Sequence, residues 1–219
     1  MIQKRFLTVA IIIVCDLLAG CSKPCVPAET VRIKIQETVY RLPAAFQPTI
    51  YVGRKTFPTR DKIRDGRRVQ EYCQRPEDPP ATADGFSLGQ RSLSLIMKRY
   101  PEFVRLEGLD IIAVEYAPAS HPPAEKATGA LVSDGLFRRA DHNGTFELFS
   151  TGPLLFRNQI AARCGPAPTH EPSTSCGIWG QIKPGTLIRV DLNDPPHPAS
   201  DWPRTLEEVE RLIKSFTNP

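Results

Sequence analysis

Residues 136–149 read LFRRADHNGTFELF, and this stretch carries the clearest structural signal of the 219-residue chain. Asn143-Gly144 supplies the two positive-φ positions that a type I′ turn requires. Phe137 before the turn, and Phe146 and Leu148 after it, can then face a core. The stretch therefore predicts a β-hairpin, and with it an antiparallel sheet.

Alternation of apolar and polar residues predicts further strands on both sides of this hairpin. Val31, Ile33 and Ile35 alternate with polar residues, which is typical of a half-buried strand. Other strands are expected at residues 49–52, 86–97, 110–116, 177–182 and 186–192, the last two joined through Lys183-Pro184-Gly185. Residues 92–100 fit a short helix ended by Pro101 equally well. Residues 54–84 show no periodicity and are expected to form a long loop or short irregular pieces.

The C-terminal segment predicts one amphipathic helix. Thr205-Leu206-Glu207-Glu208 has the pattern of a capping box, and an apolar face follows at helical spacing. Trp179 is expected in the core, and Trp202 is expected to fold the helix entry onto the body; the alternative for either is an interface anchor. No repeat or change of composition divides the chain. The predicted fold class is α+β, a predominantly antiparallel β-sheet with a C-terminal amphipathic helix, disulfide-braced, forming one domain over residues 31–219.

The N-terminus carries an export signal. Lys4 and Arg5 precede a ten-residue apolar run, residues 6–15, which is too short to span a bilayer as a helix. Leu18-Ala19-Gly20-Cys21 then resembles the lipobox of bacterial lipoproteins. The resemblance implies cleavage between Gly20 and Cys21, with residues 1–20 as signal peptide and residues 21–30 as a lipidated tether.

The same resemblance implies a place in the cell. A lipoprotein cysteine carries two or three acyl chains, so Cys21 would hold the protein stably on a membrane. In Gram-negative lipoproteins an aspartate after the cysteine favours the inner membrane, and here the residue is Ser22. The expectation is an outer-membrane lipoprotein whose domain faces the periplasm.

Four cysteines remain after the lipobox, and an exported chain is expected to oxidise them. Cys25, Cys73, Cys164 and Cys176 allow three connectivities. The pairing favoured here is the local one, Cys164 with Cys176, which leaves Cys25 with Cys73. The alternative is a metal site formed by Cys164, His170 and Cys176, but their spacing is wider than that of usual zinc sites.

One segment concentrates positive charge. The whole chain has 28 basic and 24 acidic residues, an excess too small to indicate nucleic-acid binding. Residues 54–75, however, hold eight basic residues against Asp61, Asp65 and Glu71. A local excess of positive charge attracts anionic partners, so this segment is a candidate binding site. The alternative is a solvated loop that binds no ligand. The basic residues are Arg54, Lys55, Arg60, Lys62, Arg64, Arg67, Arg68 and Arg75, and the first seven are the proposed binding positions.

The sequence contains no H-E-x-x-H, S-x-x-K or P-loop motif, and all four histidines are expected in loops. No catalytic residue, metal or cofactor is therefore predicted. The expected function is non-catalytic binding at the membrane, as an immunity-type or inhibitor lipoprotein with a protein partner. An alternative is a structural or assembly lipoprotein contacting lipopolysaccharide or peptidoglycan. A hydrolase is less favoured, and its candidates are Ser133, Asp134, Asp141 and His142, or the pair Asp191 and Asp194.

Overall fold

The computed structural model describes eleven segments of the chain. They are residues 27–53, 55–56, 59–64, 67–116, 130–133, 136–140, 146–150, 161–166, 174–183, 185–194 and 199–217. The expected signal peptide, Cys21 and Cys25 lie outside them, as do the expected Asn143-Gly144 turn and all four histidines.

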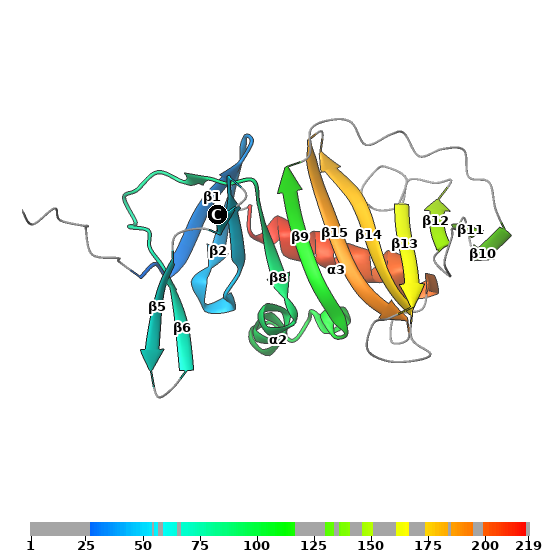
Figure 1. The fold of residues 1–219 in the computed structure, drawn as a ribbon, viewed down its shortest axis with the longest axis horizontal. Coiled ribbons are helices and arrows are strands. Elements are labelled where there is room, and N and C mark those ends of the chain that lie inside the picture. The colour runs from blue at the N-terminus through cyan, green and yellow to red at the C-terminus, as the bar shows by residue number, and fades with distance from the viewer. Residues whose placement is uncertain are drawn as a thin grey trace, which may run out of the picture.

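A long antiparallel sheet forms the centre of the molecule (Figure 1). Its order in the described residues is β10-β11-β12-β13-β14-β15-β9-β8-β3-β4. The strands are β10 Ala130–Ser133, β11 Leu136–Ala140, β12 Phe146–Ser150, β13 Ala161–Pro166, β14 Thr174–Lys183, β15 Thr186–Asp194, β9 Leu109–Tyr116, β8 Gly85–Gly89, β3 Thr49–Val52 and β4 Lys55–Thr56. Together with the C-terminal helix this confirms the predicted α+β class.

A second, three-stranded sheet has the order β2-β1-β7, with β1 Thr30–Ile35, β2 Thr38–Pro43 and β7 Ala81–Thr82. Val31, Ile33 and Ile35 of β1 are fully buried, as their alternation predicts. β1 and β2 pair antiparallel across only two intervening residues, while β1 and β7 pair in parallel. A short helix, η1 Ala44–Phe46, follows β2.

The C-terminal helix α3, Trp202–Ser215, runs across the central sheet (Figure 1). Its apolar side chains Leu206, Val209, Leu212 and Ile213 are buried, each at most 3% exposed. Burying one such side chain stabilises the fold by about 1.5–3 kcal/mol. The sheets and the helix meet at Phe86 of β8, whose ring lies 5.3 Å from that of Tyr40 and 6.3 Å from that of Phe216. Burial raises the pKa of Tyr40 to about 12.

The start of α3 differs from the predicted capping box. The helix begins at Trp202, after η4 Ala199–Asp201, so Thr205 lies inside it. Thr205 is fully buried, and its hydroxyl has no hydrogen-bond partner among the described residues. Glu208 instead accepts a hydrogen bond from the backbone N–H of Arg105 at 2.8 Å, in η2 Val104–Leu106. A tertiary contact thus uses the carboxylate that the sequence assigned to capping. Trp202 is 2% exposed, so the predicted docking of the helix entry is confirmed.

The β14–β15 hairpin was predicted, and its turn is held by a distant residue. Gly185 has φ +78°, and a Cβ there would collide with the side-chain amide of Gln36, in the turn between β1 and β2. Thr186, fully buried, donates a hydrogen bond to Gln36 Oε1 at 3.3 Å. Gly185 is therefore required both by its backbone angle and by this close approach.

Two other predictions are corrected in part. Residues 86–97 form β8 followed by helix α2, Gln90–Arg99, which places the helical alternative correctly. The hairpin at 136–149 is present as β11 and β12, but Ala140 pairs with Phe146. A two-residue turn at Asn143-Gly144, continued without interruption, would pair Ala140 with Glu147. The register is shifted by one residue, which changes the residues that share a face.

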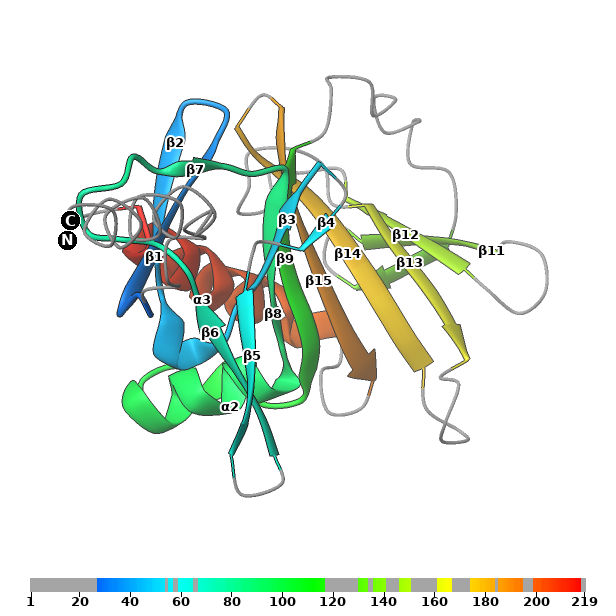
Figure 2. The ribbon, with the colours of Figure 1, turned by 60° about the vertical axis from the view of Figure 1, so that its left-hand side comes forward.

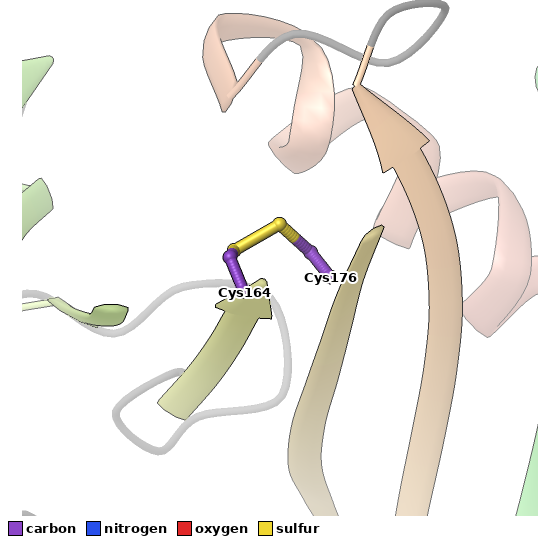
Figure 3. The surroundings of a disulfide bond; sticks show 2 residues. All are labelled: Cys164 and Cys176. Atoms are coloured by element: carbon purple, nitrogen blue, oxygen red, sulfur yellow. A yellow bond between two sulfur atoms is a disulfide. The ribbon is translucent and has the colours of Figure 1, made fainter. Parts of the chain in front are cut away.

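The Cys164–Cys176 disulfide is present (Figure 3). Its cysteines occupy directly paired positions of β13 and β14, with a Cα–Cα distance of 4.1 Å. Because both sulfurs are joined to each other, neither serves as a thiolate ligand, and the predicted alternative of a metal site is wrong. Cys73 is also disulfide-bonded, while its predicted partner Cys25 lies outside the described residues.

Candidate interaction surfaces

The face of the central sheet opposite α3 carries a row of residues that were not predicted to act together. Cross-strand pairing places Ser87, Ala113, Arg189 and Trp179 at successive positions on β8, β9, β15 and β14. Ser87 and Ala113 are small and almost fully buried, at 5% and 4% exposed. Arg189 and Trp179 keep partial exposure. Tyr51 of β3 joins the row through a 3.0 Å hydrogen bond between its hydroxyl and that of Ser87. We call these five residues the sheet-face row.

Arg189 is fixed within this row by a carboxylate on its own strand. Asp191, two residues on, accepts hydrogen bonds from Nε at 2.9 Å and from Nη2 at 2.5 Å. The hydrogen bonds to Asp191 raise the pKa of Arg189, so the guanidinium keeps its charge. The Arg189 side chain is still 42% exposed, against 21% for Asp191. A held cation therefore remains accessible on this face.

Trp179 is not a core residue, which corrects the prediction. Its ring extends over Gly177 of the same strand, because a Cβ on Gly177 would lie 2.9 Å from Trp179 Cη2 and 3.1 Å from Asp191 Oδ1. The fully buried neighbour Ile178 faces the core instead. Because Gly177 has no side chain, the indole of Trp179 can pack beside the Arg189–Asp191 pair.

The basic segment forms a hairpin rather than the predicted loop, because Thr59–Arg64 (β5) and Arg67–Tyr72 (β6) pair antiparallel. β5 and β6 form a separate two-stranded sheet in the described residues. Five of the seven proposed binding positions lie on it, namely Arg60, Lys62, Arg64, Arg67 and Arg68. Lys55 lies on β4, and Arg54 lies outside the described residues.

The root of this basic hairpin is joined to the core and to the N-terminal end of the described chain. Tyr72 is 3% exposed, and burial raises its pKa to about 12. Its carbonyl accepts a 3.0 Å hydrogen bond from the backbone N–H of Ala28, and Pro27 forms a β-bridge with Cys73. The end of the expected tether and the end of β6 are therefore attached to each other.

The chain after the root is fastened to β1. The amide of Gln74 pairs with the backbone of Arg32, accepting from its N–H at 2.6 Å and donating to its carbonyl at 2.9 Å. The Arg32 guanidinium donates to the carbonyls of Arg75, Pro76 and Asp78. The Gln74 amide thus satisfies the backbone of Arg32 next to the residues of β1 that pair with β7.

The hydrolase alternative gains no assembled site in the described residues. Asp191 is engaged by Arg189, and Asp194 occupies a β15 position of opposite parity. Because successive positions of a strand alternate between the two faces of the sheet, the positions of Asp191 and Asp194 lie on opposite faces. Ser133 lies on β10, while Asp134, Asp141 and His142 lie outside the described residues. Among the described residues no group of three or more His, Cys, Asp or Glu is placed to bind a metal.

Two sequence signals pointed to features that were missed. Asp65-Gly66 separates Arg64 from Arg67, and this dipeptide is typical of two-residue hairpin turns. The pattern Gly177-x-Trp179, aligned with Arg189-x-Asp191 across the predicted hairpin, places all four residues on one face. Strands β2, β4, β7, β10 and β13 were also not predicted.

Comparison with known proteins gives little further guidance. No family model matches the chain, and no curated protein matches it. One structure found by the search is the iron-regulated outer membrane lipoprotein FrpD of Neisseria meningitidis, at 15% identity and a TM-score of 0.41. The superposition covers 87% of this chain and 93% of that one. We draw no functional conclusion from a similarity of this size. No helix in the described part of the chain has the length and apolarity needed to cross a membrane.

Proposed function

We propose that this protein is a lipid-anchored protein of the cell envelope that binds a protein partner without catalysis. The sheet-face row is the observation that carries the proposal. Trp, Tyr and Arg are the side chains most enriched among residues that dominate binding energy at protein interfaces. Here Trp179, Tyr51 and Arg189 stand around the small residues Ser87 and Ala113 on one face.

The geometry favours a binding role for this row over a purely structural one. The inner face of the same strands supplies the core, with Ile112, Ile188 and Val190 each at most 1% exposed. Trp179, on the outer face, remains partly exposed. A cation held by Asp191 loses little side-chain freedom on binding, which reduces the entropic cost of an interface.

The membrane part of the proposal comes from the sequence. The LAGC motif ending at Cys21 supports acylation, and Ser22 supports sorting to the outer membrane. Within this class we favour an immunity-type or inhibitor protein, since a permanent anchor raises the local concentration of a binder at the envelope.

The test uses the full lipidated chain, purified in detergent and used to capture partners from envelope extracts. We expect one protein at fixed stoichiometry, and we expect Trp179→Ala to weaken its binding by at least about tenfold, as at an interface hot spot. Tyr100→Ala is the matched control, because Tyr100 is 38% exposed at the end of α2. Equal binding by both variants would exclude the sheet-face row as the partner site.

A second candidate is binding to an anionic envelope polymer, favoured by the five basic positions of the β5–β6 hairpin. Binding of this kind weakens steeply with ionic strength, whereas a packed protein interface does not. Retention on lipopolysaccharide or peptidoglycan that disappears at about 0.5 M salt would support it, since the Debye length there falls to a few ångströms.

A further inference from the structure

We propose that the basic hairpin docks on the anionic phospholipid surface in which the protein is anchored, and so sets the orientation of the domain. The inference rests on the lipid anchor of the proposed function and adds a second membrane contact. It is independent of the partner that the sheet-face row binds.

The distance between the anchor and the hairpin root is short. Six peptide steps separate Cys21 from Pro27, a span of at most about 20 Å. Pro27 forms a β-bridge with Cys73, and Ala28 is hydrogen-bonded to Tyr72. The root of the hairpin is consequently held within about 20 Å of the bilayer surface, whatever path the tether takes.

The hairpin is long enough to close this gap. β5 and β6 have six residues each, about 20 Å at the usual rise of a strand. The ends of β5 and β6 that are remote from Tyr72 project beyond the neighbouring elements in both views (Figures 1 and 2). The root is held by Tyr72, which is 3% exposed, and Arg64 and Arg67 occupy the opposite end of the hairpin.

The register gathers the positive charge on one face. Arg60, Lys62 and Arg64 occupy alternate positions of β5, and Arg67 is paired with Arg64. All four therefore belong to the same face of the hairpin. The one acidic position on that face is Glu71, at the root. Tyr72 belongs to the opposite face and is buried in the core, and Glu71 Oε2 is buried as well. The root is therefore held through both faces, and Lys62, Arg64 and Arg67 lie farther along the hairpin.

Phospholipid is favoured over wall polymer because the anchor holds the hairpin next to lipid. Attraction between exposed charges decays within a Debye length of about 8 Å at physiological ionic strength. A tethered hairpin samples the membrane at a high effective concentration, which a polymer not joined to the chain does not offer. Basic residues beside a lipid anchor are a recurrent second membrane signal.

The test measures backbone amide exchange in the full lipidated protein, reconstituted into vesicles. One set contains phosphatidylethanolamine with phosphatidylglycerol, and the other contains phosphatidylethanolamine with phosphatidylcholine. We expect exchange over residues 59–72 to be several-fold slower on the anionic vesicles, and this protection to disappear at about 0.5 M salt. Equal exchange on both sets would overturn the proposal, and so would protection gained from peptidoglycan but not from anionic vesicles.

Two double variants with equal loss of charge provide the comparison. Arg64→Gln with Arg67→Gln should abolish the difference between vesicles. Lys98→Gln with Arg99→Gln, at exposed positions of α2, should leave it intact. Unchanged thermal unfolding of both proteins confirms that each is folded. If both variants keep the difference, the basic face is not responsible. The mass of the peptide that contains Cys21 shows separately whether the anchor is present. Partner binding by Trp179→Ala tests the sheet-face row. Failure of one proposal can therefore be distinguished from failure of the other.

Discussion

The β14–β15 and β5–β6 hairpins share antiparallel pairing but differ in their surroundings. β14–β15 is flanked by β13 and β9, buries one face against the core and has its turn held by Gln36. β5–β6 has no further strand beside it in the described residues and is secured at its root. An isolated two-stranded hairpin is marginal in water. The comparison shows that neighbouring strands and the core support β14–β15, whereas β5–β6 depends on its root.

The largest expected effect is a loss of stability on removal of a ring from the core, which the β5–β6 hairpin does not share. Phe86→Ala should lower the free energy of unfolding by about 3–5 kcal/mol, because it removes a fully buried ring between Tyr40 and Phe216. Chemical denaturation measures this loss, and Val104→Ala, at a position 65% exposed, is the control and should change stability by less than about 0.5 kcal/mol. If the stability of Phe86→Ala stayed near that of the native protein, the meeting of sheets and helix at Phe86 would not be central to the fold.

An alkaline titration probes the body and the hairpin root together. Burial raises the pKa of both Tyr40 and Tyr72 to about 12, above their value of 10.0 in an unfolded chain. The folded state therefore binds more protons than the unfolded state between these values, and stability falls as pH rises through this interval. Each tyrosine accounts for a loss on the order of 2–3 kcal/mol.

Tyrosinate absorbance and circular dichroism, followed together, measure this titration. Tyr40→Phe and Tyr72→Phe should each remove part of the pH dependence. Ionisation of Tyr72 near pH 10.0 without loss of structure would show that the hairpin root is open to solvent, contrary to its burial.

The smallest effect concerns the support of the β14–β15 turn. Thr186 and Thr205 are both fully buried, but only the hydroxyl of Thr186 has a partner in the described residues, the amide of Gln36. Thr186→Val should cost about 1 kcal/mol, whereas Thr205→Val should raise stability by a similar amount, because it removes a buried hydroxyl without a hydrogen bond. Melting temperatures compare the two variants directly. A fall in both would mean that the Thr205 hydroxyl does cap the helix, as its sequence pattern suggested.

Sequence alternation predicted strands wherever one face is buried and the other is polar. Val31, Ile33 and Ile35 satisfy this pattern, and β9, β14 and β15 were predicted for the same reason. β5 and β6 were missed because their residues are mostly polar on both faces, so the period of two carries no apolar signal. Only the Asp65-Gly66 dipeptide marked their turn.

The candidate site was harder to predict because it depends on contacts between distant strands. Trp179 follows Ile178, and with two successive apolar residues the alternation does not say which faces the core. The predicted capping box was wrong for a similar reason, since Glu208 accepts a hydrogen bond from the backbone of Arg105, which is remote in sequence. The basic residues were identified from composition, but their concentration on one face required the register of the hairpin.

The junction of Pro27 and Ala28 with Tyr72 and Cys73 also has a mechanical consequence. If the chain is anchored at Cys21 as proposed, tension between the membrane and a bound partner would enter the fold at this point. Two chain segments would share the load there before it reached β1, so the first strand would not peel from β2 as a free end would.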